Sequence, residues 1–391
     1  MHYLTSGESH GPALLAILEG LPAGLPLTPE IINRELARRQ RGYGSGPRMK
    51  LEHDQVEILG GVMDGHTIGA SLAMRIANHN HERWRGRPIP PMTAPRPGHV
   101  DLAAALKYRY RDLRPGLERA SARETAARVA VGAVCKHLLA QFSVRVEGYV
   151  TAIGAVQADL ATIPLEERAA RAEENDLRCP DPQAEAAMRA AIEATIRARD
   201  TLGGVIEIIA LGLPAGLGSH VHWERRLDAR LGAAALSVQA IKGVEIGPAF
   251  ANARLRGTQA HDPIHLQADG TLTRPTNRSG GLEGGITTGQ PLLVRAAMKP
   301  IATTLTPQPS VDLAARTAAP TEYERSDFCP VPRAVPVLEA AIAFVLADAL
   351  LEKLGGDSLQ EMLPRFAALP RPRLDDLPMD GQARVWWGED G

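Results

Sequence analysis

A short segment near the N-terminus carries three side chains that could take part in catalysis. Gly7–Gly11 reads GESHG, so a glutamate, a serine and a histidine lie between two glycines, directly before an apolar run. Glycine lets the backbone approach a ligand closely, and His10 could transfer protons near neutral pH. The same residues also suit a tight turn with a hydrogen-bonded histidine, and the spacing alone leaves both interpretations open.

A second histidine, His99, follows a Pro-Gly turn beside Arg96. The segment after it is rich in arginine, with members at Arg109, Arg111, Arg114, Arg119 and Arg123. A similar group runs from a predicted helix into a glycine-rich loop and consists of Arg34, Arg38, Arg39, Arg41 and Arg48. Guanidinium groups near a helix N-terminus, here at Ser121, suit a phosphate or carboxylate. Each group could instead be a solvated face, although the glycine-rich turns beside them favour anion binding.

Further candidate binding residues lie in the C-terminal half. Ser279–Gly289 reads SGGLEGGITTG. Such a loop lets a planar or phosphorylated ligand touch the backbone, but it also occurs as a plain hairpin connection. The next strand leads to Lys299–Thr304, where a lysine and two threonines offer donors to an anion. Arg325 and Asp327 pair a cation with a carboxylate, although an exposed pair of this kind often contributes little.

Common nucleotide and metal motifs are missing from the sequence. It contains no Gly-x-x-x-x-Gly-Lys-Ser/Thr segment and no Gly-x-Gly-x-x-Gly segment between a strand and a helix, which argues against a P-loop or Rossmann site. Three histidine pairs could each offer two metal ligands: His79 with His81, His220 with His222, and His261 with His265. None has a further ligand at a recognised spacing, so we predict no metal site.

Composition limits the function classes. The 391 residues include 44 Lys and Arg against 45 Asp and Glu, which argues against a nucleic-acid-binding protein because such proteins carry a basic excess. The cysteines Cys135, Cys179 and Cys329 are too widely spaced for a disulfide framework or a zinc ribbon. The N-terminus lacks a secretory pattern, and the apolar stretch Val337–Leu351 is too short to span a bilayer. We therefore expect a cytoplasmic protein that does not bind a membrane.

Local patterns predict the elements that position these residues. Leu14–Gly20 is typical of a buried strand, and a helix should begin after Thr28 with Pro29 in its first turn and end near Gln40. The other elements expected in this half are strands over Val56–Gly60 and Thr67–Ile76, an extended segment over 78–98, and a helix from the capping box Ser121–Glu124 to Ala140.

The second half predicts a similar mixture of elements. They are strands over Val144–Ile153 and Gly204–Leu213, a helical region over Leu165–Asp200, and helices over Leu227–Ile241 and Pro336–Leu354. No linker divides the chain, so we expect one catalytic domain over residues 1–369 and a Pro-rich tail over residues 370–391. Trp386 and Trp387 in this tail should dock on a neighbouring surface.

Two segments of the chain resemble each other. LLAILEGLPAGL at Leu14–Leu25 matches IEIIALGLPAGL at Ile206–Leu217. In each segment a predicted buried strand leads into the same turn and then into an arginine-rich helix. The matching order of elements favours an internal duplication over a chance match of common residues.

Taken together, the motifs resemble the chorismate synthase family and occur in its order from Tyr3 to Leu354. The matching segments are GESHG (Gly7–Gly11), RRQRGYG (Arg38–Gly44), RM (Arg48–Met49), RPGH (Arg96–His99), LERASARETAARVA (Leu117–Ala130), LGGVIE (Leu202–Glu207), QAIKGVEIG (Gln239–Gly247), TNRSGGLEGG (Thr276–Gly285), MKPI (Met298–Ile301) and RSD (Arg325–Asp327). The segment ERASARETA alone is highly specific for this family.

The resemblance implies an anti 1,4-elimination of phosphate from 5-enolpyruvylshikimate 3-phosphate that gives chorismate. This reaction belongs to the shikimate pathway and serves aromatic amino acid biosynthesis. The family needs reduced FMN although the reaction has no net redox change, and some members reduce the flavin with NADPH. The resemblance also implies an α+β fold, in which a β-α-β sandwich holds helices between two antiparallel sheets, and a homotetramer.

The resemblance further assigns roles to single residues. His10 is similar to the histidine that protonates reduced FMN, His99 to the acid beside the departing phosphate, and Asp327 to the carboxylate that works with flavin N5 to remove the C6 hydrogen. The residues that match FMN-contacting stretches are Arg119, Ala120, Ser121, Gln239, Ala240, Gly284, Lys299, Pro300, Ile301, Ala302, Thr303 and Arg325. Those expected to contact an anion of the substrate or of NADP are Arg39, Arg48 and Arg123.

The sequence departs from the family pattern at several positions. Ser45 stands where the family has the second arginine of GYGRG, and Arg48 could compensate for it. The usual His-Ala-Asp is His-Val-Asp at His99–Asp101. Two other function classes compete with this interpretation: a flavin oxidoreductase with net hydride transfer, and an arginine-rich RNA-binding protein without catalysis.

Overall fold

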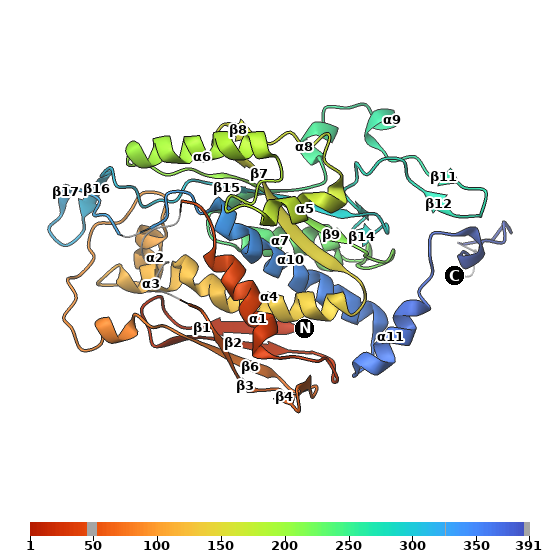
Figure 1. The fold of residues 1–391 in the computed structure, drawn as a ribbon, viewed down its shortest axis with the longest axis horizontal. Coiled ribbons are helices and arrows are strands. Elements are labelled where there is room, and N and C mark those ends of the chain that lie inside the picture. Colours follow the sequence, from red (N-terminus) through yellow and green to blue (C-terminus); the bar gives the residue numbers. More distant parts are fainter. Residues whose placement is uncertain (45–52, 325, 387–391) are drawn as a thin grey trace.

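The computed structural model describes residues 1–44, 53–324 and 326–386, which form a mixed α+β chain (Figure 1). A four-stranded antiparallel sheet is built by the N-terminal part of the chain. Its order is β1 (His2–Ser6), β2 (Ala13–Glu19), β6 (Leu72–Ala77) and β3 (Val56–Gly60). Residues alternate along β2, so that Leu14, Ala16 and Leu18 are buried while Leu15 and Ile17 are exposed. One face of this sheet therefore lies on the core and the other faces outward.

A five-stranded antiparallel sheet is built by the later part of the chain. Its order is β10 (Ile241–Ile246), β15 (Leu292–Met298), β9 (Gly204–Leu211), β7 (Arg145–Ile153) and β8 (Val156–Gln157). The central strand β9 is buried on both faces, because every side chain from Ile206 to Ala210 is buried. Its side chains are apolar in this stretch except for Glu207, which is typical of a strand covered on both faces.

Helices lie between the two sheets in the view of Figure 1. They are α1 (Pro29–Gln40), α4 (Thr125–Ala140), α7 (Leu227–Leu236) and α10 (Val331–Leu354). Helix α4 packs on β2 and β6, whereas α10 packs on β7 and β9. The two helices approach so closely at Gly132 that a Cβ there would lie 2.1 Å from the Cβ of Ala340. A side chain larger than hydrogen would force them apart.

Helix α10 differs from its sequence prediction. It begins at Val331 rather than Pro336, and Pro336 lies inside it. With 24 residues it is long and apolar enough to cross a membrane, so the prediction that its apolar stretch is too short was wrong. However, 83% of its most apolar window is buried inside the structure, and its contacts with α4 and β7 account for its composition.

Several other predicted elements are confirmed with shifted boundaries. The strand expected over Thr67–Ile76 is divided at Gly69, whose φ of +79° turns the chain between β5 (His66–Thr67) and β6. The helical region expected over Leu165–Asp200 is two helices, α5 (Leu165–Glu173) and α6 (Pro182–Arg197). Asp181 begins the second helix by accepting from the backbone N–H groups of its first turn. Helix α7 ends at Leu236 because the chain turns at Ala240 and enters β10.

The remaining elements are short and lie around this core. The helices are α2 (Asp101–Tyr108), α3 (Arg114–Ala120), α8 (Ala249–Asn252), α9 (Gly257–Ala260) and α11 (Leu359–Ala367). The two-stranded ladders are β4 (Val62–Met63) with β5, β11 (His265–Leu266) with β12 (Leu272–Thr273), β13 (Leu282–Glu283) with β14 (Ile286–Thr287), and β16 (Pro309–Asp312) with β17 (Thr317–Pro320). Single turns of 3-10 helix are η2 (His81–Arg83), η3 (Ala122–Glu124), η4 (Trp223–Arg225) and η5 (Leu374–Asp376).

The two LPAGL turns share one hydrogen-bond pattern. In the first, the Thr67 hydroxyl donates to the carbonyl of Pro22 and accepts from the N–H of Leu25. In the second, the Thr287 hydroxyl donates to the carbonyl of Pro214 and accepts from the N–H of Leu217. Each threonine ends a short hairpin that precedes a sheet strand, β6 in one case and β15 in the other.

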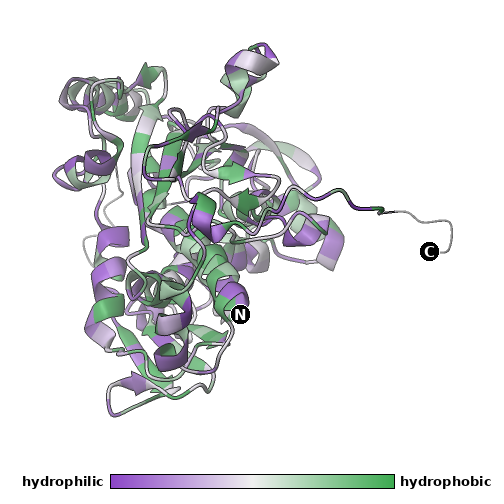
Figure 2. Cartoon of the chain, turned by 90° about the vertical axis from the view of Figure 1, so that its right-hand side faces the viewer, coloured by the Kyte–Doolittle hydropathy of each residue, from purple (hydrophilic) through white to green (hydrophobic). Residues whose placement is uncertain are grey.

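The segment after α11 begins along the β11–β12 hairpin. The Pro372 carbonyl accepts from the N–H of Leu272, and the N–H of Leu374 donates to the carbonyl of Gly270. Beyond this point the described chain extends away from the body (Figure 2). Trp386 is 74% exposed in the single chain, and Trp387 lies outside the described residues.

Candidate functional site

The loop that carries His10 connects β1 and β2. Gly7 has a φ of +108°, and a Cβ there would lie 2.3 Å from the carbonyl oxygen of Ala13, so the turn requires glycine. The Asn78 side chain donates to the carbonyls of Glu8 and Gly11 and so fixes the loop to the end of β6. The ring of Trp84 lies 4.6 Å from that of His10, centroid to centroid.

Glu118 on α3 binds His10 directly. Its Oε1 lies 2.7 Å from Nδ1 of His10, and its Oε2 accepts from the backbone N–H of His10 at 2.8 Å. Burial alone would raise the pKa of Glu118, but the hydrogen bonds from His10 outweigh it and lower that pKa. The same loop meets the helix region at a second point, where Ser9 Oγ lies 3.2 Å from Ser121 Oγ.

His99 is held by a buried carboxylate. Its Nδ1 lies 2.5 Å from Oδ1 of Asp101, which also accepts from Nη2 of Arg96 at 3.0 Å. The other oxygen, Oδ2, accepts from Nε of Arg96 at 2.8 Å. Burial would raise the pKa of Asp101, but the hydrogen bonds from His99 and Arg96 hold it well below its ordinary value. His99, Asp101 and Arg96 therefore form one charged unit.

Arg96 joins this unit to the end of β15. Its Nη1 donates to Oγ1 of Thr303 at 3.1 Å. A Cβ built on Gly98 would lie 3.7 Å from Nζ of Lys299, so the ammonium group also lies close to the His99 turn. Burial lowers the pKa of Lys299, and the nearby charge of Lys242 lowers it further. The RPGH and MKPIAT segments therefore lie together in the structure.

The segment of Asp327 is joined to the same group through the residue before it. Its carboxylate pairs with Nη1 of Arg333 at 2.5 Å. The neighbouring Ser326 donates to the carbonyl of Thr303 at 3.1 Å, which links this segment to Arg96 through one residue. Arg325, the other member of the RSD motif, lies outside the described residues.

Glu124 binds side chains from both halves of the chain, and the sequence did not indicate it as a candidate site residue. Its Oε1 accepts from the hydroxyl of Thr5 at 2.7 Å, and its Oε2 accepts from Nε2 of Gln239 at 3.2 Å. Burial would raise its pKa, but the charge of Arg128 outweighs this and lowers it. The sequence presented Glu124 only as part of a capping box, and no local signal showed partners more than 110 residues away. In the structure Ser121 accepts from Arg123 N–H, whereas the carboxylate of Glu124 is engaged elsewhere.

The structure brings some of the predicted cofactor residues to these contacts and places Gly284 elsewhere. Arg119 donates to Thr5 from the end of α3, and Ala240, with a φ of +66°, accepts at its carbonyl from the N–H of Lys299. Oε1 of Gln239 is buried and has no hydrogen-bond partner within the described chain. Gly284 lies in the β13–β14 hairpin, where its nearest neighbour is the side chain of His220.

Arg39 and Arg123 are buried and donate to protein acceptors. Nε of Arg39 donates to Oγ1 of Thr125 at 2.9 Å, and Nη1 of Arg123 donates to Oδ1 of Asp54 at 2.6 Å. Arg123 also donates to Oδ1 of Asn78, the residue that fixes the His10 loop. Arg123 is thus linked to that loop through Asn78, whereas Arg39 binds Ala122 and the first residue of α4, Thr125. Arg48, the third predicted anion contact, and Ser45 lie outside the described residues.

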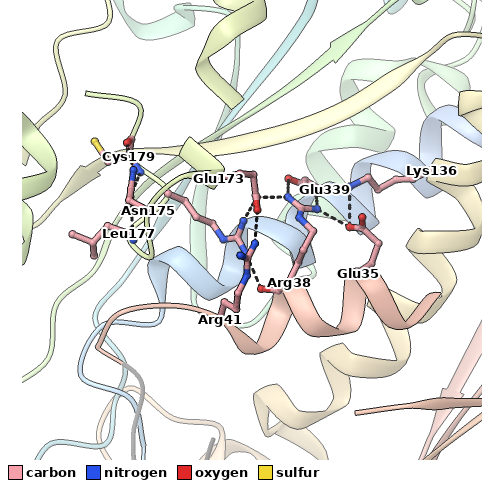
Figure 3. Close-up of polar contacts among 10 residues, drawn as sticks. Glu35, Arg38, Arg41, Lys136, Glu173, Asn175, Leu177, Cys179 and Glu339 are labelled. Carbon is pink, nitrogen blue, oxygen red and sulfur yellow. Dashed lines mark hydrogen bonds and ion pairs between the residues drawn. The ribbon is translucent and has the colours of Figure 1, made fainter. Parts of the chain in front are cut away.

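Arg38 and Arg41 belong to a separate ionic cluster (Figure 3). Arg38 binds Glu339 with both terminal nitrogens, at 2.6 and 2.9 Å, and Arg41 pairs with Glu173 at 2.7 Å. Burial would raise the pKa of Glu339, but the charges of Lys136 and Arg38 lower it. Carboxylates of the same chain therefore already bind both arginines, although the side chain of Arg41 is 60% exposed. Their contact with an external anion stays a prediction.

A cavity of about 330 Å³ opens beside this ionic cluster. Its charged lining includes Arg34, Arg38, Lys136, Glu35 and Glu339. Since its lining holds four Lys or Arg side chains and four Glu side chains, the cavity offers little net attraction for a multiply charged anion. The described residues in its wall include neither His10 nor His99 nor Asp327. The candidate site comprises the residues around His10 and those around His99, which are linked through Glu124, Gln239 and Lys299.

Metal-ligating groups do not gather in the described part of the chain. Among residues 1–44, 53–324 and 326–386, no group of three or more His, Cys, Asp or Glu side chains could hold a metal ion. His81, a member of one histidine pair, instead places Nδ1 3.0 Å from the carbonyl oxygen of His10. This contact with the loop of His10 accounts for the position of the His81 ring without a metal ligand role.

Comparisons with known proteins agree with the motifs. A sequence model of the chorismate synthase family matches residues 1–351. The chain is 52% identical over 381 residues to the chorismate synthase of Symbiobacterium thermophilum, covering 94% of this chain and 97% of the relative. It is 53% identical over 380 residues to that of Moorella thermoacetica, covering 94% and 98%. A crystal structure of chorismate synthase superposes with a TM-score of 0.77 at 43% identity, covering 94% of this chain and 96% of that one. The chain belongs to the chorismate synthase family.

Proposed function

We propose that the chain eliminates phosphate from 5-enolpyruvylshikimate 3-phosphate and releases chorismate. This makes it a carbon–oxygen lyase of the shikimate pathway, active in aromatic amino acid biosynthesis. The observation that carries the proposal is the convergence of separate segments: Arg96 contacts Thr303, and Ser326 contacts the same residue. His99 and the segment of Asp327 thereby reach one locality, as an elimination with a departing phosphate requires.

Reduced FMN is the cofactor of this proposal. Bound reduced FMN would supply electron density for the departure of phosphate, without net redox change. The buried, unpartnered Oε1 of Gln239 fits a donor group of such a ligand, and Lys299 fits its electron-rich or anionic parts. The further residues proposed to hold it are Arg119, Ala120, Ser121, Ala240, Gly284, Pro300, Ile301, Ala302, Thr303 and Arg325. NADPH is the proposed external source of electrons.

The catalytic roles belong to three residues. His10 is proposed to donate a proton at the cofactor and His99 to donate a proton to the departing phosphate. Asp327 is proposed to work with N5 of the flavin in removing the C6 hydrogen. Histidine suits the first two roles because its ring exchanges protons near neutral pH. Arg39, Arg48 and Arg123 are proposed to meet anions of the substrate or of NADP.

A homotetramer is the proposed assembly. The outer face of the N-terminal sheet supports self-association, because Leu4, Leu15 and Ile17 lie on it and are 41–62% exposed. Register places Leu4 directly beside Ile17. An apolar sheet face of this kind is normally covered by a partner, and a second copy of the chain would supply a matching surface.

The finer description of the fold is also part of the proposal. We infer a β-α-β sandwich that arose by internal duplication, supported by the matching Thr67 and Thr287 bonds at the two LPAGL turns. Residues 1–369 would form one catalytic domain and residues 370–391 a tail. The cytoplasm is the proposed compartment.

An anaerobic turnover assay tests the function. Purified protein receives substrate and dithionite-reduced FMN, and phosphate and chorismate are measured against the amount of flavin. We expect many molecules of both products per flavin. Stoichiometric consumption of reductant would indicate a net oxidoreductase, and absence of phosphate release would exclude the elimination.

A further inference from the structure

Glu118 binds the backbone and the ring of His10 with different oxygens. Oε2 accepts from the backbone N–H at 2.8 Å, and Oε1 lies 2.7 Å from Nδ1. Both side chains are largely buried, with 18% of His10 and 13% of Glu118 exposed. The carboxylate therefore determines the position of the loop and the orientation of the ring together.

Hydrogen-bond chemistry then fixes which nitrogen of the ring carries hydrogen. An ionised carboxylate can only accept, so Nδ1 of His10 must be the donor. The lowered pKa of Glu118 keeps this carboxylate ionised at neutral pH. In the neutral ring the lone pair is then on Nε2, and in the charged ring the additional proton is on Nε2.

Neighbouring groups oppose rotation of the ring. Trp84 lies against one side, with ring centroids 4.6 Å apart, and Nδ1 of His81 contacts the carbonyl of His10 at 3.0 Å. The backbone of Glu118 is also bound to the loop, because its carbonyl accepts from the N–H of Ser9. Turning the ring away from Glu118 would lose the bond to Oε1 and change the contact with the indole.

We propose that Glu118 is a positioning residue that holds His10 in the Nδ1–H form, so that Nε2 is the atom that exchanges the catalytic proton. The inference rests on the proposed function, in which His10 is the proton donor at the cofactor. It assigns to the first glutamate of the ERASARETA segment, Glu118, a role separate from contact with FMN. The aspartate of a serine-protease triad acts on its histidine by the same principle.

Nitrogen NMR of the full chain tests the tautomer directly. Protein labelled with ¹⁵N-histidine is compared with His10→Ala to assign the signals of His10. We expect Nδ1 to be the protonated nitrogen in the wild type and Nε2–H to dominate in Glu118→Ala. Glu118→Gln keeps the shape but offers one acceptor oxygen to two donors, so we expect a smaller shift in the same direction. Glu57→Gln, which alters an exposed pair with Arg75, is the matched control and should change nothing.

Kinetics separate positioning from a general structural role. Glu118→Ala should lower kcat about 10²-fold. This effect is smaller than the loss of about 10⁴-fold in kcat that follows replacement of the orienting aspartate in a serine-protease triad. KM for the substrate should stay within a factor of about 3, because the proposed role concerns a proton and not binding. In a His10→Ala background the same substitution should have no further effect, since it acts only through the ring.

Three results would overturn the inference: a wild-type His10 with its proton on Nε2, wild-type turnover in Glu118→Ala, or an equal loss when His10 is already absent. Failure of the proposed function gives a different pattern. In that case the wild type makes no chorismate, while the tautomer still changes in Glu118→Ala. That pattern would support the contact between Glu118 and His10 and refute its catalytic use.

Discussion

Replacement of Asp101 by asparagine should damage both the stability and the activity of this chain. Asp101 is fully buried and accepts from His99 and from Arg96, which is itself only 6% exposed. Asparagine has nearly the same shape but no charge and one acceptor oxygen fewer. Arg96 would then be a buried cation without its counter-charge, and His99 would lose the acceptor that fixes its Nδ1 proton.

The expected loss of stability can be estimated. Breaking a buried ion pair from one side costs about 3–5 kcal/mol. With 391 residues at about 2.1 cal/mol/K each, the unfolding entropy is about 0.8 kcal/mol/K, so the melting temperature should fall by about 4–6 °C. Turnover should fall about 10²–10⁴-fold, as for loss of a correctly oriented acid.

The effect on stability should depend on pH in one direction. The pKa of Asp101 is lower in the folded chain than in the unfolded chain, so its contribution is present above the ordinary aspartate value of about 4. It is lost as the pH falls below that value through the folded pKa. Wild type and Asp101→Asn should therefore differ most near pH 7 and converge in acid.

Scanning calorimetry and the phosphate assay measure the two effects. Asp176→Asn is the matched control, because Asp176 pairs with Arg189 but is 48% exposed. We expect that control to shift the melting temperature by less than about 1 °C. A variant of Asp101 that melts and turns over like the wild type would refute the reasoning about this buried unit.

Other predictions concern the site and the assembly. His10→Ala, His99→Ala and Asp327→Ala should each slow turnover about 10²–10⁴-fold while FMN still binds in a fluorescence titration; wild-type rates in all three would contradict their roles. Lys299→Ala should weaken FMN binding about 10-fold in the same titration, and unchanged affinity would exclude Lys299 as a contact. Ile17→Glu should reduce the mass measured by light scattering, whereas an unchanged tetramer would place the interface elsewhere.

The sequence predicted helices and strands correctly where neighbouring residues determine their ends. Thr28 and Pro29 mark the start of α1, and the observed helix covers Pro29–Gln40 as expected. Strand β3 has the predicted bounds, Val56–Gly60. The predicted start of α10 at Pro336 is wrong, because proline is typical of the first turn of a helix but lies inside this one. Packing of α10 against α4 and β7 supports the helix from Val331.

Long-range pairing explains what the sequence could not predict about the site. Glu118 and His10 are 108 residues apart, and Arg38 and Glu339 are 301 residues apart. An arginine in a predicted anion-binding cluster and an arginine in an internal ion pair look the same in sequence. Only the fold shows that Arg38 faces Glu339, while Arg96 meets Thr303 beside His99.

A crystal structure of the full chain with FMN and substrate tests most directly where the reaction takes place. We predict density for the flavin beside Gln239 and Lys299, with the substrate phosphate near His99. Flavin in the 330 Å³ cavity beside Arg38 and Lys136, with the two histidines free of ligand, would contradict the assignment of the site.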